Sequence, residues 1–232
     1  MAIQIQSTQG ASLAHGIKCM VYGLSGVGKT RLLASAPQPI IISAENGLLS
    51  LRNFNLPYIA IRNIAELREA HSYLSGPNGR QFSTIGLDSA SEIAEVCLHE
   101  AKKVNKDPRK AYGDAQDEMI EIFRRYRDIP GKNVVFLAKQ EFTTDGQTGA
   151  KYFAPSFPGN KLAQAAPYFF DEVWQLTNFT DPATGAKIRA LRTSPDNQNA
   201  AKDRSGTLAE WENADPATGG GLAYLFNKMQ KG

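Results

Sequence analysis

The stretch from Gly23 to Thr30, GLSGVGKT, constrains this chain more than any other part of its sequence. It fits G-x-x-x-x-G-K-[ST], the pattern of loops that hold the phosphates of a nucleoside triphosphate. Glycines let backbone N–H groups approach phosphate oxygens, while Lys29 supplies a positive charge and Thr30 a hydroxyl for Mg²⁺. Lys29 is therefore also a catalytic candidate. The predicted nucleotide contacts are Gly23, Leu24, Ser25, Gly26, Val27, Gly28, Lys29, Thr30 and Arg31.

The segments on either side of this loop support the prediction. Residues 17–22 (IKCMVY) form an apolar run typical of a buried strand, and residues 30–36 (TRLLASA) begin a helical pattern. Strand, glycine loop and helix then follow one another in the order that a phosphate site requires. A glycine-rich turn without a ligand is the alternative, and this order disfavours it.

The rest of the chain alternates apolar runs with amphipathic helical stretches as far as about residue 141. The apolar runs cover residues 40–43, 57–61, 83–87 and 133–138. Continuous apolar strands between helices are typical of a parallel sheet covered on both faces. We therefore expect a three-layer α/β core, residues 17–232, preceded by an N-terminal arm, residues 1–16, with an edge strand at residues 2–6.

After residue 141 the sequence no longer follows this alternation of apolar runs and helical stretches. Residues 171–177 and 186–193 predict an antiparallel pair of strands, and residues 222–230 a closing helix. The expected fold class is thus a mostly parallel P-loop core with an antiparallel C-terminal extension.

Composition and charge exclude some classes of protein but do not identify the function. With 42% hydrophobic and 21% charged residues, the chain has the composition of a folded globule. A net charge of +3 permits a nucleic-acid partner but does not require one. No apolar run approaches the roughly 18 residues of a membrane span, and the first residues lack a signal-peptide pattern. We expect a cytoplasmic protein with reduced cysteines and no membrane partner.

Two acidic residues follow predicted strands on the side where ligands bind to parallel sheets. Asp88 follows the run TIGL and suits a carboxylate that holds Mg²⁺ through water, together with Thr30; the alternative is a helix N-cap. Glu45 follows IIISA and suits a base that orients and deprotonates water; the alternative is a solvent-facing turn residue. Lys139 and Gln140 follow the run NVVFLA, and either side chain is placed to touch the γ-phosphate.

In their order, these segments resemble the RecA/RadA family of ATPases. The resemblance rests on GLSGVGKT, IIISAENGL with Glu45, TIGLDS with Asp88 and VVFLAKQ, and it covers residues 17–206. In length and motif order the chain is most similar to the short RecA-core proteins of bacteriophages, including RadA-like single-strand annealing proteins. The resemblance implies ATP and Mg²⁺ as cofactors, Glu45 acting on water, and a glutamine that couples the γ-phosphate to a DNA-binding loop.

The resemblance also implies assembly. The segment AKDRSG, residues 201–206, is similar to the K-N-R-F-G signature of RadA-type proteins but departs from it at Asp203 and Ser205. It implies a homo-oligomer with ATP between subunits, in which Lys202 and Arg204 reach the γ-phosphate of a neighbour. A solvated basic loop is the alternative. Implied partners are single-stranded DNA and a single-strand DNA-binding protein, in a bacterial host cytoplasm if the chain is phage-encoded.

A DNA surface is expected in the loop at residues 142–161. Aromatic side chains there stack on bases while lysines meet phosphates; the alternative is a hairpin whose aromatics pack on the sheet. The candidate nucleic-acid residues are Lys151, Tyr152, Phe153, Phe157 and Lys161.

Three functions remain open from the sequence. The first is an ATP-hydrolysing protein, stimulated by DNA, that binds single-stranded DNA and promotes annealing or homologous recombination. The second is an ATP-gated loader or accessory module that acts on a replication protein and needs no aromatic DNA surface. The third is a small-molecule phosphotransferase, although an arginine-bearing lid is not evident in the sequence.

Overall fold

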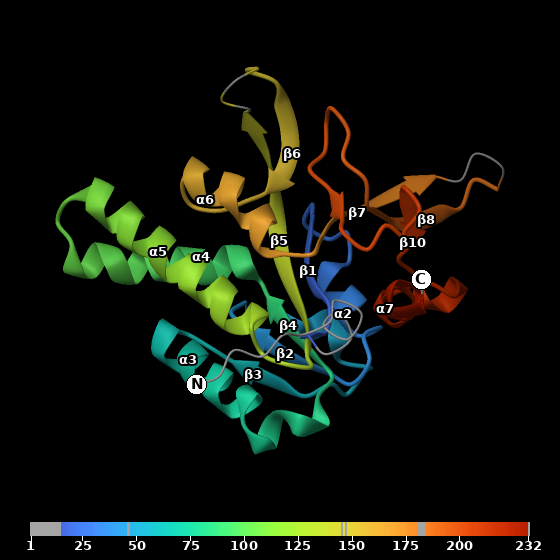
Figure 1. Ribbon diagram of the computed structural model, residues 1–232, viewed down its shortest axis with the longest axis horizontal. Coiled ribbons are helices and arrows are strands. Elements are labelled where there is room, and N and C mark those ends of the chain that lie inside the picture. Colours follow the sequence, from blue (N-terminus) through green and yellow to red (C-terminus); the bar gives the residue numbers. More distant parts are fainter. Residues whose placement is uncertain (1–14, 46, 145, 147, 181–183, 232) are drawn as a thin grey trace, which may run out of the picture.

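The computed structural model describes residues 15–45, 47–144, 146, 148–180 and 184–231. The edge strand predicted at residues 2–6 lies outside these residues. Ten strands of the described part join one sheet in which β10-β8-β7-β1-β5-β4-β2-β3 are neighbours in that order, with β6 paired to β5 and β9 to β7 (Figure 1). The strands are β1 (Lys18–Gly23), β2 (Pro39–Ser43), β3 (Tyr58–Ala60), β4 (Thr84–Asp88), β5 (Asn133–Thr144), β6 (Lys151–Pro155), β7 (Glu172–Thr180), β8 (Lys187–Arg192), β9 (Lys202–Asp203) and β10 (Trp211–Asn213).

The central strands are parallel and the added ones antiparallel. β1 pairs in parallel with β5 and β7, and β4 pairs in parallel with β2 and β5. β8 runs antiparallel to both β7 and β10. The predicted fold class, a mostly parallel three-layer core with an antiparallel C-terminal extension, is therefore confirmed.

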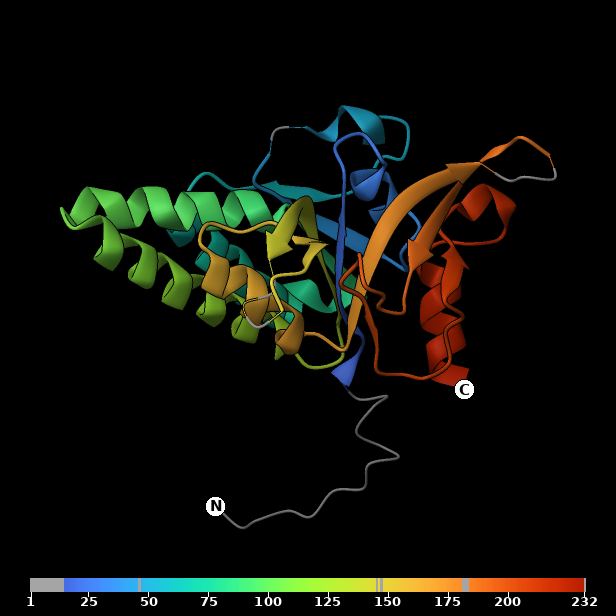
Figure 2. The same cartoon turned by 90° about the horizontal axis from the view of Figure 1, so that it is seen from above.

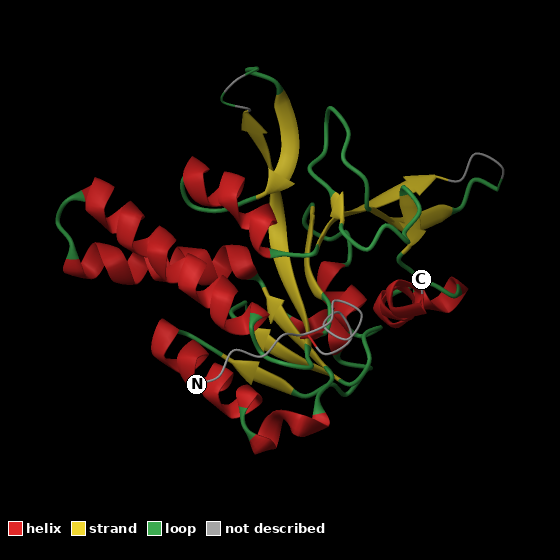
Figure 3. Ribbon diagram, viewed as in Figure 1, coloured by secondary structure: helices red, strands yellow, loops and turns green. Residues whose placement is uncertain are grey.

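Helices cover both faces of this sheet (Figure 3). One apolar core lies beneath α3 (Ile64–Ser75), α4 (Ala90–Val104) and α5 (Pro108–Arg127), and it includes the buried rings of Phe123, Tyr126 and Phe136. A second core lies beneath α2 (Lys29–Leu33) and α7 (Leu222–Lys231), around Leu33, Trp174 and Phe226. The short helix α6 (Asn160–Ala165) follows β6. Apolar residues on both faces explain why the central strands read as continuous apolar runs.

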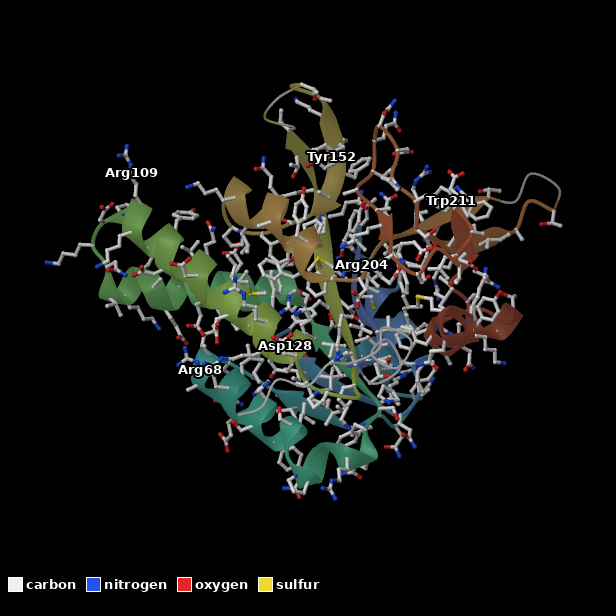
Figure 4. All side chains as sticks on the ribbon, viewed as in Figure 1. Arg68, Arg109, Asp128, Tyr152, Arg204 and Trp211 are labelled. Atoms are coloured by element: carbon white, nitrogen blue, oxygen red, sulfur yellow. The ribbon has the colours of Figure 1, made fainter. Side chains whose placement is uncertain are left out.

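Capping side chains begin two of the long helices. The Asn63 side chain accepts a hydrogen bond from the Glu66 N–H at 2.8 Å and begins α3. Ser89 accepts from the Glu92 N–H and begins α4. α4 and α5 then pack as a long pair that projects beyond the sheet (Figure 2), and Arg109 points away from the body near the tip of this pair (Figure 4). Among the described helices, none has the length and apolar character needed to cross a membrane.

Strand β5 is longer than the sequence predicts. The apolar run ends at Ala138, yet the strand continues to Thr144 and pairs with β6 as an antiparallel hairpin. Parallel pairing with β1 ends where Gly23 meets Lys139. Lys139 and Gln140 therefore lie inside a strand rather than after one, at the level where that strand leaves the body of the sheet.

Candidate functional site

The phosphate loop joins β1 to α2 at the carboxyl edge of the sheet. Gly26 and Gly28 have φ of 77° and 103°, values that favour glycine, and Gly28 caps α2. A Cβ on Gly23 would lie 2.5 Å from the Leu176 carbonyl oxygen, so close packing of β7 also demands glycine there. The Val27 side chain is buried in the core, and among side chains of this loop it serves as the apolar anchor.

Lys29 folds back over the loop. Its ammonium group donates hydrogen bonds to the carbonyl oxygens of Gly23 at 2.8 Å and Leu24 at 2.9 Å. Burial lowers the pKa of Lys29, while the nearby Asp88 and Glu45 carboxylates oppose that shift. The charge is thus held over the loop by oxygen atoms that phosphate oxygens can replace.

Thr30 and Asp88 meet as the sequence predicts for a metal pair. The Thr30 hydroxyl donates to Asp88 Oδ2 at 2.6 Å. Asp88 is 6% exposed, and burial raises its pKa while the hydrogen bond from Thr30 opposes the shift. The helix cap is Ser89 rather than Asp88, so the N-cap alternative for Asp88 is wrong.

This pair fits a magnesium ion that also binds phosphate. Mg²⁺ takes hard oxygen ligands and is commonly held by one or two protein groups, waters and substrate phosphates. A hydroxyl and a carboxylate side by side next to the phosphate loop match that donor set. Among the described residues, no cluster of three or more His, Cys, Asp or Glu side chains offers another metal site.

Glu45 lies at the same edge, one strand away from Asp88. β2 pairs with β4 so that Ser43 lies opposite Asp88, and Glu45 follows two residues later. The Ser89 hydroxyl donates to Glu45 Oε1 at 2.6 Å, and the Ser43 hydroxyl donates to the Glu45 carbonyl oxygen. The Glu45 carboxylate is therefore oriented by Ser89, while Ser43 holds the Glu45 backbone, contacts that a simple solvent-facing turn does not need.

Lys139 lies beside the carboxylates of Glu45 and Glu92, whereas Gln140 faces away from them. The Lys139 ammonium lies 2.9 Å from Glu92 Oε2 and 4.0 Å from Glu45 Oε1, and the hydrogen bond to Glu92 raises its pKa. Side chains alternate along a strand, and the odd-numbered β5 residues Val135 and Leu137 pack in the core beneath α2. Gln140 accepts a hydrogen bond from Gln175 at 3.1 Å instead.

Lys202 and Arg204 lie far from the phosphate loop of their own chain. β9 pairs with the beginning of β7, with Asp203 opposite Glu172, and Glu172 is level with Cys19 at the start of β1. The phosphate loop follows the other end of that strand. Lys202 donates to the Phe170 carbonyl oxygen at 2.6 Å, and Arg204 pairs with Asp171 at 2.9 Å.

The predicted DNA loop is a projecting hairpin of β5 and β6, on which Figure 4 labels Tyr152. Lys151 is exposed, and the Phe153 ring is half-buried against Phe142 with centroids 4.0 Å apart. Phe142 is 65% exposed, and the sequence does not single it out, because it stands apart from the apolar run, after the polar residues Lys139, Gln140 and Glu141.

The structure contradicts the prediction for Phe157, and it places Lys161 on a helix rather than on the β5–β6 hairpin. Phe157 is 5% exposed and packs edge-on against Phe123, with centroids 5.7 Å apart, so its predicted role of stacking on bases is wrong. Phe157 belongs to the buried apolar cluster that also includes Leu162 and Ala163 of α6, so burial of its ring determines its position. Lys161 is exposed on α6, which follows the hairpin.

The hairpin is tied to the strand that carries the phosphate loop. Tyr22, the residue before Gly23, is buried, and its hydroxyl lies 2.6 Å from the Ala200 carbonyl oxygen and 3.2 Å from that of Phe153. The Ala200 N–H in turn donates to the Phe153 carbonyl oxygen at 2.8 Å. One side chain thus links β1, the hairpin and the loop before β9.

Comparison with protein families agrees with a phosphate-loop domain. Residues 15–205 match the protein family described as "AAA domain". The chain is similar to the KaiC-like protein PH0186 from Pyrococcus horikoshii OT3, with 12% identity, a TM-score of 0.46, and coverage of 76% of this chain and 77% of that one. It is also similar to the RadB recombinase, with 16% identity, a TM-score of 0.43, and coverage of 78% and 82%.

No curated protein matches the chain. The family match extends over most of the sequence and includes the phosphate loop, Glu45, Asp88 and Lys139. The chain therefore belongs to the AAA domain family of P-loop ATPases.

Proposed function

We propose that this protein hydrolyses ATP, binds single-stranded DNA, and promotes annealing or homologous recombination. The proposal rests on the length of β5. This single strand carries both Lys139, which lies beside Glu45, and Phe142, which lies on the hairpin. A change at the γ-phosphate that moves Lys139 therefore has a short covalent path to the aromatic hairpin.

The chemistry proposed for the ATP site assigns a role to each charged group. Lys29 would neutralise phosphate charge, and Thr30 and Asp88 would hold Mg²⁺, which would supply further positive charge against the phosphates. Glu45 accepts a proton from the attacking water while Ser89 keeps that carboxylate in place.

Between the two candidates for γ-phosphate contact, the geometry favours Lys139. Its ammonium already neighbours Glu45 and Glu92, whereas Gln140 is engaged with Gln175. A cation at this position stabilises charge that develops during hydrolysis. Gln140 is then better placed to transmit a shift of β5 to the neighbouring strands than to touch phosphate.

For assembly, we propose that ATP lies between subunits and that Lys202 and Arg204 serve the site of a neighbour. The support is their position at the opposite end of the sheet, which keeps them from the phosphate loop of their own chain. Arg204 is 61% exposed and its partner Asp171 is on the surface too, so exchange of that ion pair for a phosphate costs little.

The first prediction concerns the proposed DNA surface. Replacing Phe142 with alanine removes an exposed ring, and stacking on a base contributes about 1–3 kcal/mol, so affinity for labelled oligo-dT should fall roughly tenfold. Lys151→Ala should reduce the dependence of affinity on salt by about 0.7 in log–log slope. Titrations at several salt concentrations, followed by fluorescence anisotropy, measure both quantities.

Two variants on the other hairpin serve as matched controls. Phe179 is 42% exposed on β7 and Lys187 is exposed on β8, and neither belongs to the proposed DNA surface. Phe179→Ala and Lys187→Ala should bind oligo-dT like the unmodified protein. Equal loss in all four variants, or none in any, would show that the β5–β6 hairpin is not the DNA surface and would favour a protein partner instead.

A further inference from the structure

Arg189 on β8 lies directly against the phosphate loop. A Cβ on Gly28 would be 3.1 Å from its Nε and 3.3 Å from its Cζ, so the guanidinium group covers the glycine that precedes Lys29. β8 is held in this position by its antiparallel pairing with β7, in which Arg189 lies opposite Asn178. The antiparallel extension thus brings an arginine to the nucleotide site of the same chain.

This arginine has no anionic partner within the described part of the chain. Its side chain is half-buried, yet it forms no hydrogen bond or ion pair with any described residue. Arg192, on the same strand, pairs with Asp196 at 3.0 Å and with Glu210 at 2.9 Å. Buried charges are ordinarily paired, so a half-buried guanidinium group beside a phosphate loop, unpaired among the described residues, is suited to bind an anion such as a phosphate.

We propose that Arg189 is a second cation of the nucleotide site and that it contacts the phosphates of a nucleoside di- or triphosphate held on the loop. The inference rests on the nucleotide-binding part of the proposed function and needs neither DNA nor a second subunit. A guanidinium group suits this task because its planar N–H groups donate two parallel hydrogen bonds to phosphate oxygens. Phosphates would then lie between Lys29 and Arg189.

This role also gives the antiparallel extension a function at the site. The hairpin of β7 and β8 projects from the body of the protein (Figure 2), and Arg189 pairs with Asn178 partway along it, between the end pairs Gln175–Arg192 and Thr180–Lys187. A bound nucleotide would hold β8 toward the loop through this side chain. Arg189 would accordingly position the phosphates, while Glu45 and Lys139 act on the opposite side of β1.

The test measures the affinity of the full-length protein for ATP, ADP and inorganic tripolyphosphate by calorimetry. Arg189→Ala and Arg189→Gln should each weaken all three by about tenfold or more, since both remove charged hydrogen bonds to phosphate. Arg189→Lys should recover part of the loss. Lys187→Ala, an exposed lysine on the same strand, should match the unmodified protein, and none of the variants should melt at a lower temperature without nucleotide.

Three results would overturn the proposal. Normal binding of tripolyphosphate by Arg189→Ala, with weaker ATP and ADP, would mean that the arginine contacts the base or ribose. Full affinity in Arg189→Gln, with a lower melting temperature in Arg189→Ala, would make it a packing residue. Failure of the unmodified protein to bind any of the three probes would remove the nucleotide site itself, which is distinguishable from a loss confined to Arg189 variants.

Discussion

Lys29→Ala is expected to weaken ATP binding by about a hundredfold or more, because it removes a positive charge that makes two or more charged hydrogen bonds. The melting temperature of the nucleotide-free protein should change little. Among the described residues, the Lys29 ammonium donates hydrogen bonds only to the carbonyl oxygens of Gly23 and Leu24, and its burial disfavours the charge. Calorimetric titration with ATP measures the loss, with Lys110→Ala on the surface of α5 as control. Unchanged affinity would contradict the assignment of the phosphate loop.

The same variant tests whether sites are shared between subunits. Arg204→Ala retains the phosphate loop and should bind ATP normally but hydrolyse it slowly. Mixed with Lys29→Ala protein, it should form some sites with an intact loop from one chain and an intact arginine from another. Recovered hydrolysis in the mixture supports a shared site. No recovery, when mixed assemblies are demonstrated by crosslinking, would show that Arg204 serves no neighbour.

Glu45→Gln is expected to bind ATP and Mg²⁺ normally and to hydrolyse ATP about a hundredfold more slowly, since an amide cannot accept the proton of water. The glutamine oxygen can still accept the Ser89 hydrogen bond, so the geometry of the site is retained. Asp88→Asn is the matched comparison. It should weaken the Mg²⁺-dependent part of ATP binding, because an amide is a poorer ligand than a carboxylate.

Single-turnover hydrolysis, with ATP bound before the reaction begins, separates binding from chemistry for these two variants. Glu45→Gln should show slow chemistry at full occupancy, and Asp88→Asn should show reduced occupancy at low Mg²⁺. Hydrolysis at the normal rate by Glu45→Gln would mean that another group accepts the proton and that Glu45 is held by its serines for structural reasons alone.

The carboxyl edge of the sheet could be predicted because local patterns determine it. An apolar run followed by a polar residue marks both the strand and its end, and parallel strands bring those ends together. Glu45 and Asp88 are predicted in this way, whereas Thr30 follows from the phosphate-loop pattern, and the contacts of all three follow from neighbouring elements. The orientation of Glu45 by Ser89 was not predicted, because a serine after a strand also signals a helix cap, and Ser89 performs both tasks.

Features that depend on long-range pairing could not be predicted. Arg189 reaches Gly28 only because β7 joins the sheet beside β1 and β8 folds back along β7, a register that no local pattern contains. Lys202 is similarly placed by its pairing with Val173. Phe157 shows the remaining ambiguity, because an aromatic residue near lysines has the same local sequence whether its ring is buried or exposed.

The rate of ATP hydrolysis with and without oligo-dT tests the central claim most directly. We predict a higher rate with oligo-dT, lost at high salt and in Phe142→Ala, because DNA on the hairpin and ATP at the carboxyl edge act through β5. An equal rate with and without oligo-dT, from protein that binds and hydrolyses ATP, would contradict it and would leave a P-loop ATPase whose regulator is not DNA.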